Sequence, residues 1–119
     1  MGLTRDQILE AADLVIEPVP VPEWGGDVGV RVMSAADRDA FEASMIEVGE
    51  DGRRRPHLVN MRAKLVAAAA CDDAGNRIFA DEDVLLLARK SSAALNRVYE
   101  AAARLNGLGN RSVEDAAKN

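Results

Sequence analysis

The sequence predicts an α+β fold that is mainly α, with one N-terminal β-hairpin packed on a bundle of about four to five helices. Prolines at positions 18, 20 and 22 exclude a helix there, and Gly25-Gly26 suits a tight hairpin turn. Further along the chain, apolar residues recur at helical spacing. The length of 119 residues fits one domain, so we expect a globular domain over 1–110 and a flexible tail over 111–119.

A short helix is expected before the hairpin, over about 5–12. Thr4 and Gln7 fit the capping-box pattern, in which each side chain satisfies a free backbone amide at the helix start. The hairpin strands are expected at about 14–21 and 27–33. In the second strand, valines alternate with polar residues or glycine, which leaves one face apolar. Because proline has no N–H to donate, the first strand should lie at the edge of its sheet.

A second helix is expected to begin at the Ser34 cap and to end at Gly49. Its apolar stripe consists of Phe41, Met45, Ile46 and Val48. The next residues, 50–56, are polar and include glycine and proline, so we expect a loop there.

The alanine-rich segment 58–71 favours a third helix, because alanine has the highest helix propensity. A competing interpretation makes residues 65–71 a strand that pairs with 77–79 across a turn at 72–76. Alanine is a poor strand former, so the helix is preferred.

Two helices are expected near the C-terminus. The acidic run at 81–83 suits the start of the first of them, which extends to about residue 88. Ser91 or Ser92 should cap the second, which Gly107 ends. This last helix has the clearest amphipathic pattern in the chain, formed by Leu95, Val98, Tyr99, Ala102 and Leu105.

The sequence offers no convincing catalytic or metal site. Its single histidine, His57, and single cysteine, Cys71, lie in no recognisable nucleophile–base pattern. One His and one Cys are too few for an ordinary structural zinc site, and the acidic segment 72–76 fails the calcium-loop pattern. We therefore expect neither enzyme activity nor a cofactor, and no intramolecular disulfide, which fits a reducing cytoplasm.

Charge and hydropathy argue against nucleic acid and membrane partners. The net charge is −5 and the isoelectric point is about 4.9, which disfavours phosphate binding despite the basic run 53–55. The longest apolar stretch, 65–71, is far shorter than the roughly 20 residues that a transmembrane helix needs. The N-terminus has no signal-peptide pattern. A soluble domain that binds other proteins is the expectation.

Several segments, spread over nearly the whole chain, resemble the tail assembly chaperones of long-tailed phages, the siphovirus type. The most distinctive is the Val-Pro-Glu-Trp-Gly-Gly stretch at 21–26. The others are Leu3-Thr4-Arg5-Asp6-Gln7-Ile8-Leu9, Ala35-Ala36-Asp37-Arg38-Asp39-Ala40-Phe41-Glu42, the turn at 71–79 and the helix 91–108 that ends Leu105-Asn106-Gly107-Leu108.

The resemblance implies a viral chaperone that acts in the host cytoplasm and is absent from the finished virion. Such chaperones are thought to bind the tape measure protein, keep it soluble and help to recruit tail-tube subunits. Many occur as a short form and a frameshifted long form, and this chain would be the short form. The alternative function is a structural or connector protein of a phage tail or head–tail junction.

A chaperone for a helical client needs an apolar surface, and two candidates stand out. One is the hairpin around Trp24, and the other is the stripe of the last helix, with Leu95, Val98, Tyr99 and Leu105. Core packing is the competing interpretation for each of these residues, and the favoured one. A core with only four aromatic residues also suggests that self-association adds stability, so a homo-oligomer is a further expectation.

Overall fold

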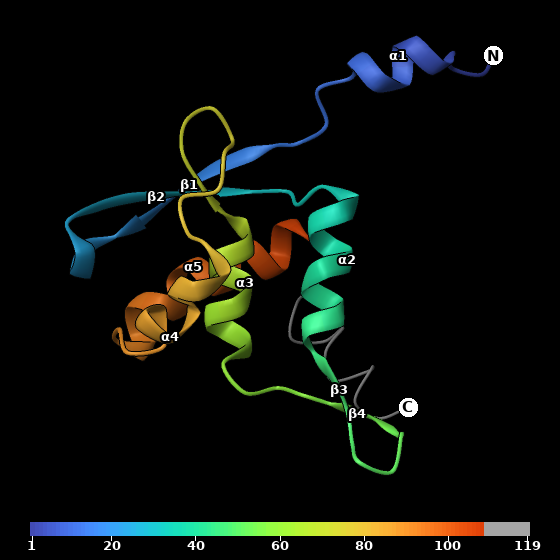
Figure 1. Ribbon diagram of the computed structural model, residues 1–119. Coiled ribbons are helices and arrows are strands. Elements are labelled where there is room, and N and C mark those ends of the chain that lie inside the picture. Colours follow the sequence, from blue (N-terminus) through green and yellow to red (C-terminus); the bar gives the residue numbers. More distant parts are fainter. Residues whose placement is uncertain (109–119) are drawn as a thin grey trace.

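A computed structural model describes residues 1–108 and shows the expected α+β fold, which is 45% helix and 19% strand (Figure 1). The strands are β1 (Ile16–Val21), β2 (Gly26–Arg31), β3 (Ile46–Val48), β4 (Arg54–Pro56) and β5 (Ala70–Cys71). The helices are α1 (Arg5–Glu10), α2 (Ala35–Ser44), α3 (Met61–Ala69), α4 (Val84–Leu87) and α5 (Ser92–Leu105), with 3-10 turns η1 (Pro22–Trp24) and η2 (Asp81–Asp83). The predicted tail, 111–119, lies outside the described residues.

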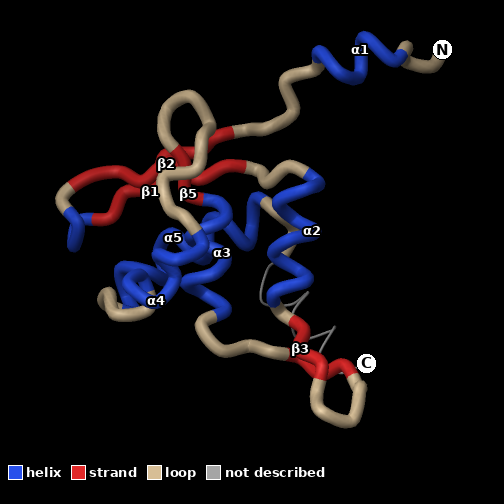
Figure 2. Tube along the Cα trace, viewed as in Figure 1, coloured by secondary structure: helices blue, strands red, loops and turns tan. Residues whose placement is uncertain are grey.

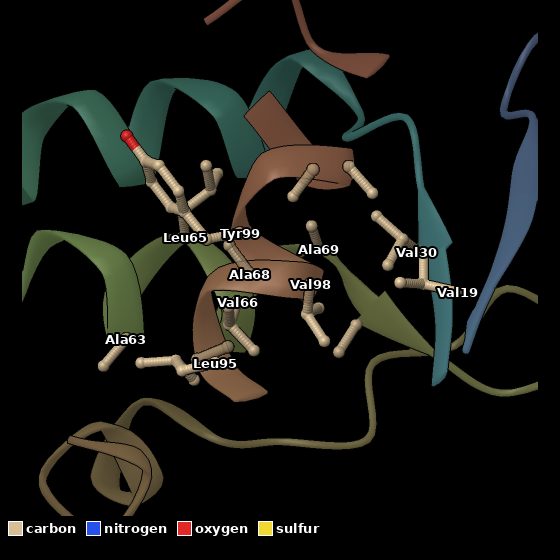
Figure 3. Packing of buried hydrophobic residues seen from close by; sticks show 14 of the residues in the cluster. Val19, Val30, Ala63, Leu65, Val66, Ala68, Ala69, Leu95, Val98 and Tyr99 are labelled. Carbon is tan, nitrogen blue, oxygen red and sulfur yellow. The ribbon is translucent and has the colours of Figure 1, made fainter. Parts of the chain in front are cut away.

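The core lies between helices α3 and α5 and the inner face of the β1–β2 hairpin (Figure 3). Small alanine side chains on both helices let them approach closely, so that larger side chains fill the space around the contact. Leu65 and Val66 from α3, Val98 from α5 and Val30 from the hairpin are almost completely buried. The prediction of a hairpin packed on helices is therefore confirmed.

The main sheet is antiparallel and has the order β1-β2-β5, so β1 is an edge strand as predicted. The Val32 N–H donates to the Val15 carbonyl, so the odd-numbered residues of β1 form the hydrogen bonds with β2. Pro18 and Pro20 therefore face the open edge, where each removes a donor. This edge is poorly suited to pairing with a further strand.

Gly29 allows β2 and β5 to pair closely. A Cβ atom at position 29 would lie 2.7 Å from the Cys71 carbonyl oxygen, which belongs to the backbone. Gly29→Ala should therefore lower the free energy of unfolding by about 1–3 kcal/mol, as overpacking does in well-packed interiors. Gly26→Ala in the same strand is the control, because its Cβ would meet no atom within 4 Å. Urea denaturation that gave both variants equal stability would contradict this.

The second helix begins at the predicted Ser34 cap, but its end and the last residues of the following loop were predicted wrongly. Helix α2 ends at Ser44, and residues 46–48 form strand β3, which pairs with β4 in a second hairpin. The Gly49 N–H donates to the Arg53 carbonyl inside this hairpin instead of capping a helix. Ile46 and Val48 are exposed, so a helical stripe there would have had nothing to pack on, and β-branched residues favour a strand.

The two interpretations of the alanine-rich segment are each correct in part. Helix α3 runs to Ala69, and the chain then extends into β5, where Cys71 forms a single bridge with Arg77. The tight turn at 72–76 is confirmed, with Gly75 at a φ of 86°. Asp72 accepts hydrogen bonds from the amides of Asn76 and Ala74 within that turn. The bond from the Asn76 amide lowers the pKa of Asp72 most, and the bond from the Ala74 amide lowers it further.

A buried arginine joins the hairpin to the helices. Arg31, at the end of β2, is 8% exposed and forms an ion pair with Asp37 of α2. Its guanidinium also donates to the carbonyls of Ala68, at 3.1 Å, and Gly75, at 3.2 Å. One side chain thus connects β2, α2, α3 and the turn at 72–76.

The last helices agree with the prediction. The acidic run forms the turn η2, which continues into α4. The Ser91 hydroxyl accepts a hydrogen bond from the Ala94 amide at the start of α5. Gly107, at a φ of 69°, follows the end of that helix.

Residues 1–14 make no hydrogen bond with the rest of residues 1–108, and the bond between Val15 and Val32 is where this segment joins the sheet. We refer to 1–15 as the N-terminal arm. Figures 1 and 2 show helix α1 projecting away from the body. The predicted capping box is present, with Thr4 and Gln7 each accepting a hydrogen bond from the other's backbone amide. Every residue of the arm is exposed.

Candidate binding grooves

An apolar groove opens beside the tip of the first hairpin, and we refer to it as the Trp24 groove. It encloses about 390 Å³ and is lined by Trp24, Ile78, Phe79, Asp83, Leu86, Leu87 and Lys90. Ile78 is 50% exposed and Leu86 is 59% exposed, whereas Trp24 is half-buried. A wide, open, mainly apolar groove of this kind suits the apolar face of an amphipathic helix.

Local sequence chemistry sets the position of Trp24. Pro22 begins the 3-10 turn that carries Trp24, and Gly25 ends it at a φ of 80°. The neighbouring Glu23 accepts a hydrogen bond of 2.9 Å from Arg97 of α5, which ties the hairpin tip to the body. A hydrogen bond with its own backbone amide, and then the bond from Arg97, lower the pKa of Glu23. The position of Trp24 is therefore fixed both by the 3-10 turn and by the bond between Glu23 and Arg97.

The predicted partner-contact residues separate into two groups. Leu95, Val98 and Tyr99 are at most 6% exposed and lie in the core between α3 and α5 (Figure 3). Leu105 is half-buried and packs against the same core. In this structure these four side chains pack in or against the core, the competing interpretation at the sequence level. Trp24 also packs partly against the core, but it lines a surface groove as well, so a partner contact there stays a prediction.

Two important groove residues were missed at the sequence level. Ile78 follows the turn at 72–76, and Leu86 lies in the short helix α4. The signal that could have found Leu86 is the run of three leucines at 85–87, because so short a helix buries only one side. Leu87 is indeed buried, while the other two leucines of the run, Leu85 and Leu86, are exposed.

A second groove of similar volume lies on the other side of α4, between α2 and α3. Phe41, Val84 and Leu85 contribute apolar surface to it. Its lining also includes Asp37, Lys64, Arg77 and Asp81. This α2–α4 groove is therefore more polar than the Trp24 groove.

The isolated histidine and cysteine lie in separate places. Cys71 is buried in β5, and burial raises the pKa of its thiol, which suits a packing role. The His57 Nδ1 atom lies 3.3 Å from the Glu47 carboxylate, beside the exposed β3–β4 hairpin. Within residues 1–108, His, Cys, Asp and Glu form no group of three that could hold a metal ion.

Comparisons with known proteins identify the family. The sequence model of the phage tail assembly chaperones matches residues 6–119. A solved structure of the bacteriophage HK97 tail assembly chaperone has a similar fold, with a TM-score of 0.57 and 19% sequence identity. The similarity covers 84% of this chain and 90% of the HK97 chain. A search of curated proteins found no match.

The family match also bears on whether the chain is an enzyme. Tail assembly chaperones are not enzymes, in agreement with the expectation from the sequence. None of the helices within residues 1–108 is long and apolar enough to cross a membrane. Because its family model matches almost the whole sequence, this chain belongs to the phage tail assembly chaperone family.

Proposed function

We propose that this chaperone binds the tape measure protein of its phage through the Trp24 groove. The observation that carries the proposal is the groove itself, an apolar surface that stays open after the core is complete. Ile78 and Leu86 expose about half of their surface there, and Trp24 forms the adjoining wall. A long helical client presents apolar side chains every third or fourth residue, which is the spacing that such grooves accept.

The charge of the chain supports a solubilising role. A net charge of −5 adds electrostatic repulsion between complexes, which opposes aggregation of an apolar client. The chaperone then recruits tail-tube subunits to the covered tape measure protein, acts in the host cytoplasm and leaves before the virion is complete. A longer form made by frameshifting in a siphovirus genome belongs to the same proposal.

Co-expression with the tape measure protein of the same phage tests this function. We expect the full chain to increase the soluble fraction of that protein and to co-purify with it. Trp24→Ala should reduce the co-purified amount by about tenfold or more, because buried tryptophan anchors often contribute 2 kcal/mol or more to binding. Arg54→Ala on the exposed β3–β4 hairpin is the control. If wild-type chain neither solubilises nor binds the client, the proposal fails.

Purified virions test the alternative. Mass spectrometry should find the chain absent or present only in traces, because a chaperone leaves the assembled tail. Stoichiometric copies would instead favour a structural or connector protein. The complex with the tape measure protein, mixed with tube subunits, should retain those subunits on a column, whereas the chain without its client should not.

A further inference from the structure

Helix α1 of the N-terminal arm makes no hydrogen bond with any other segment of residues 1–108. All hydrogen bonds found for residues 1–14 stay within that segment, among them the capping box of Thr4 and Gln7. Helix α1 has six residues, whereas an isolated helix in water needs about 12–15 to be even marginally stable. The cap therefore begins a helix that requires a surface to pack on.

The surface chemistry of the arm defines that partner. Five apolar side chains are 48–72% exposed, namely Leu3, Ile8, Leu9, Leu14 and Val15. Three acidic residues lie among them, Asp6, Glu10 and Asp13, against one basic residue, Arg5. The arm is thus apolar and acidic, and a complementary surface must be apolar and basic.

One groove of the same chain has that character. It lies between the start of α3 and the start of α5, encloses about 320 Å³ and includes Leu58, Met61, Leu95, Arg62 and Lys90. We refer to it as the basic groove, because Arg62 and Lys90 are its charged residues and none of the acidic residues within 1–108 lines it. Neither of these two cations forms an ion pair with another residue of 1–108.

We propose that the N-terminal arm of one copy docks in the basic groove of a second copy. The apolar side chains of the arm cover Leu58 and Met61, and its carboxylates pair with Arg62 and Lys90. Figures 1 and 2 show the arm leaving the body beside the sheet, whereas α3 begins on the opposite side of the body. Val15 is hydrogen-bonded to Val32, so residues 11–14 form the linker, and at about 3.3 Å each they extend roughly 13 Å and allow the arm to reach a neighbouring body.

The open edge of β1 does not offer an equally good route to self-association. Pro18 and Pro20 remove two donors from that edge, so a second copy gains few hydrogen bonds there. The arm and the basic groove bring charge complementarity as well as apolar surface. This association uses a different surface from the Trp24 groove, although Lys90 borders both grooves.

Sedimentation velocity of the full chain over a wide range of concentration tests the proposal. We expect association that weakens as salt is raised, because the pairing charges are exposed and screened. The double variant Ile8→Lys, Leu9→Lys should weaken association by about tenfold or more, because it removes apolar contacts and adds charges that Arg62 and Lys90 repel. Val48→Lys, at a similarly exposed apolar position on β3, should leave association unchanged.

Charge reversal separates docking from a general loss of structure. Asp6→Arg with Glu10→Arg, or Arg62→Glu with Lys90→Glu, should each weaken association, and a chain that carries all four changes should recover it. Circular dichroism confirms that each variant folds, and the milder pair Arg62→Gln, Lys90→Gln should give a smaller loss. A full chain that stays monomeric at every concentration would overturn the proposal. This holds also if the chain is monomeric because the arm docks on its own body. Reversed chains that associate like wild type would overturn it as well.

Discussion

Arg31→Ala should lower the free energy of unfolding by about 3 kcal/mol, at the lower end of the range for breaking a buried ion pair. The substitution leaves Asp37 without its cation and removes the donors to the carbonyls of Ala68 and Gly75. Asp37 is about one third exposed, so water relieves part of the cost. The loss should exceed that of an ordinary hydrogen bond, because three acceptors lose their partner together.

Chemical denaturation of Arg31→Ala and Arg54→Ala measures this directly. Arg54 lies on the exposed strand β4, so its removal should change stability by no more than about 0.5 kcal/mol. Arg31→Lys should recover only part of the loss, because an ammonium group cannot reproduce the fork of a guanidinium. Equal stability of the two alanine variants would show that Arg31 does not hold the hairpin to the helices.

Leu65→Ala should cost about 2–5 kcal/mol, the range for truncating a buried leucine. Leu65 is 1% exposed in the middle of α3 and belongs to the cluster between α3, α5 and the hairpin. The remaining cavity forms next to alanine-rich helix surfaces, where few large side chains are available to fill it. For a domain of this size we expect the melting temperature to fall by roughly 10 °C or more.

Leu85→Ala is the matched control for that change. Leu85 is 66% exposed on α4, so the same substitution should shift the free energy of unfolding by no more than about 0.5 kcal/mol. Calorimetry of the two variants under identical conditions makes the comparison. A loss in Leu85→Ala as large as that in Leu65→Ala would mean that the core is not where the structure places it.

The parts of the fold that follow from local chemistry could be predicted from the sequence. Prolines and glycines on both sides of Trp24 permit little besides a hairpin, and Ser91 and Gly107 bound the last helix. Strand β3 could not be predicted, because it depends on pairing with β4 on the other side of a turn. The apolar spacing of 41–48 gives no sign of that pairing. Periodicity extended the helix through Ile46 and Val48, whose side chains would have had no neighbour there.

The binding surfaces were only partly predictable for a similar reason. An amphipathic stripe shows that Leu95, Val98 and Tyr99 face something apolar, but only the packing of α3 against α5 shows that it is the core. Trp24 stood out because tryptophan is enriched among the residues that contribute most to binding. The arginine at position 31 gave no sign of its role, since its carbonyl acceptors lie 37 and 44 residues away in the chain.

Two neighbouring leucines of α4 provide the most direct test of the central claim, that the Trp24 groove is the client surface. Leu86 lines the Trp24 groove and Leu85 lines the α2–α4 groove, and the two are similarly exposed. The measurement is the dissociation constant of the purified full chain and the tape measure protein, for wild type, Leu86→Asp and Leu85→Asp. We expect Leu86→Asp to weaken binding by about thirtyfold, or ~2 kcal/mol, and Leu85→Asp to leave it nearly unchanged. Equal losses, or a larger loss for Leu85→Asp, would contradict the claim.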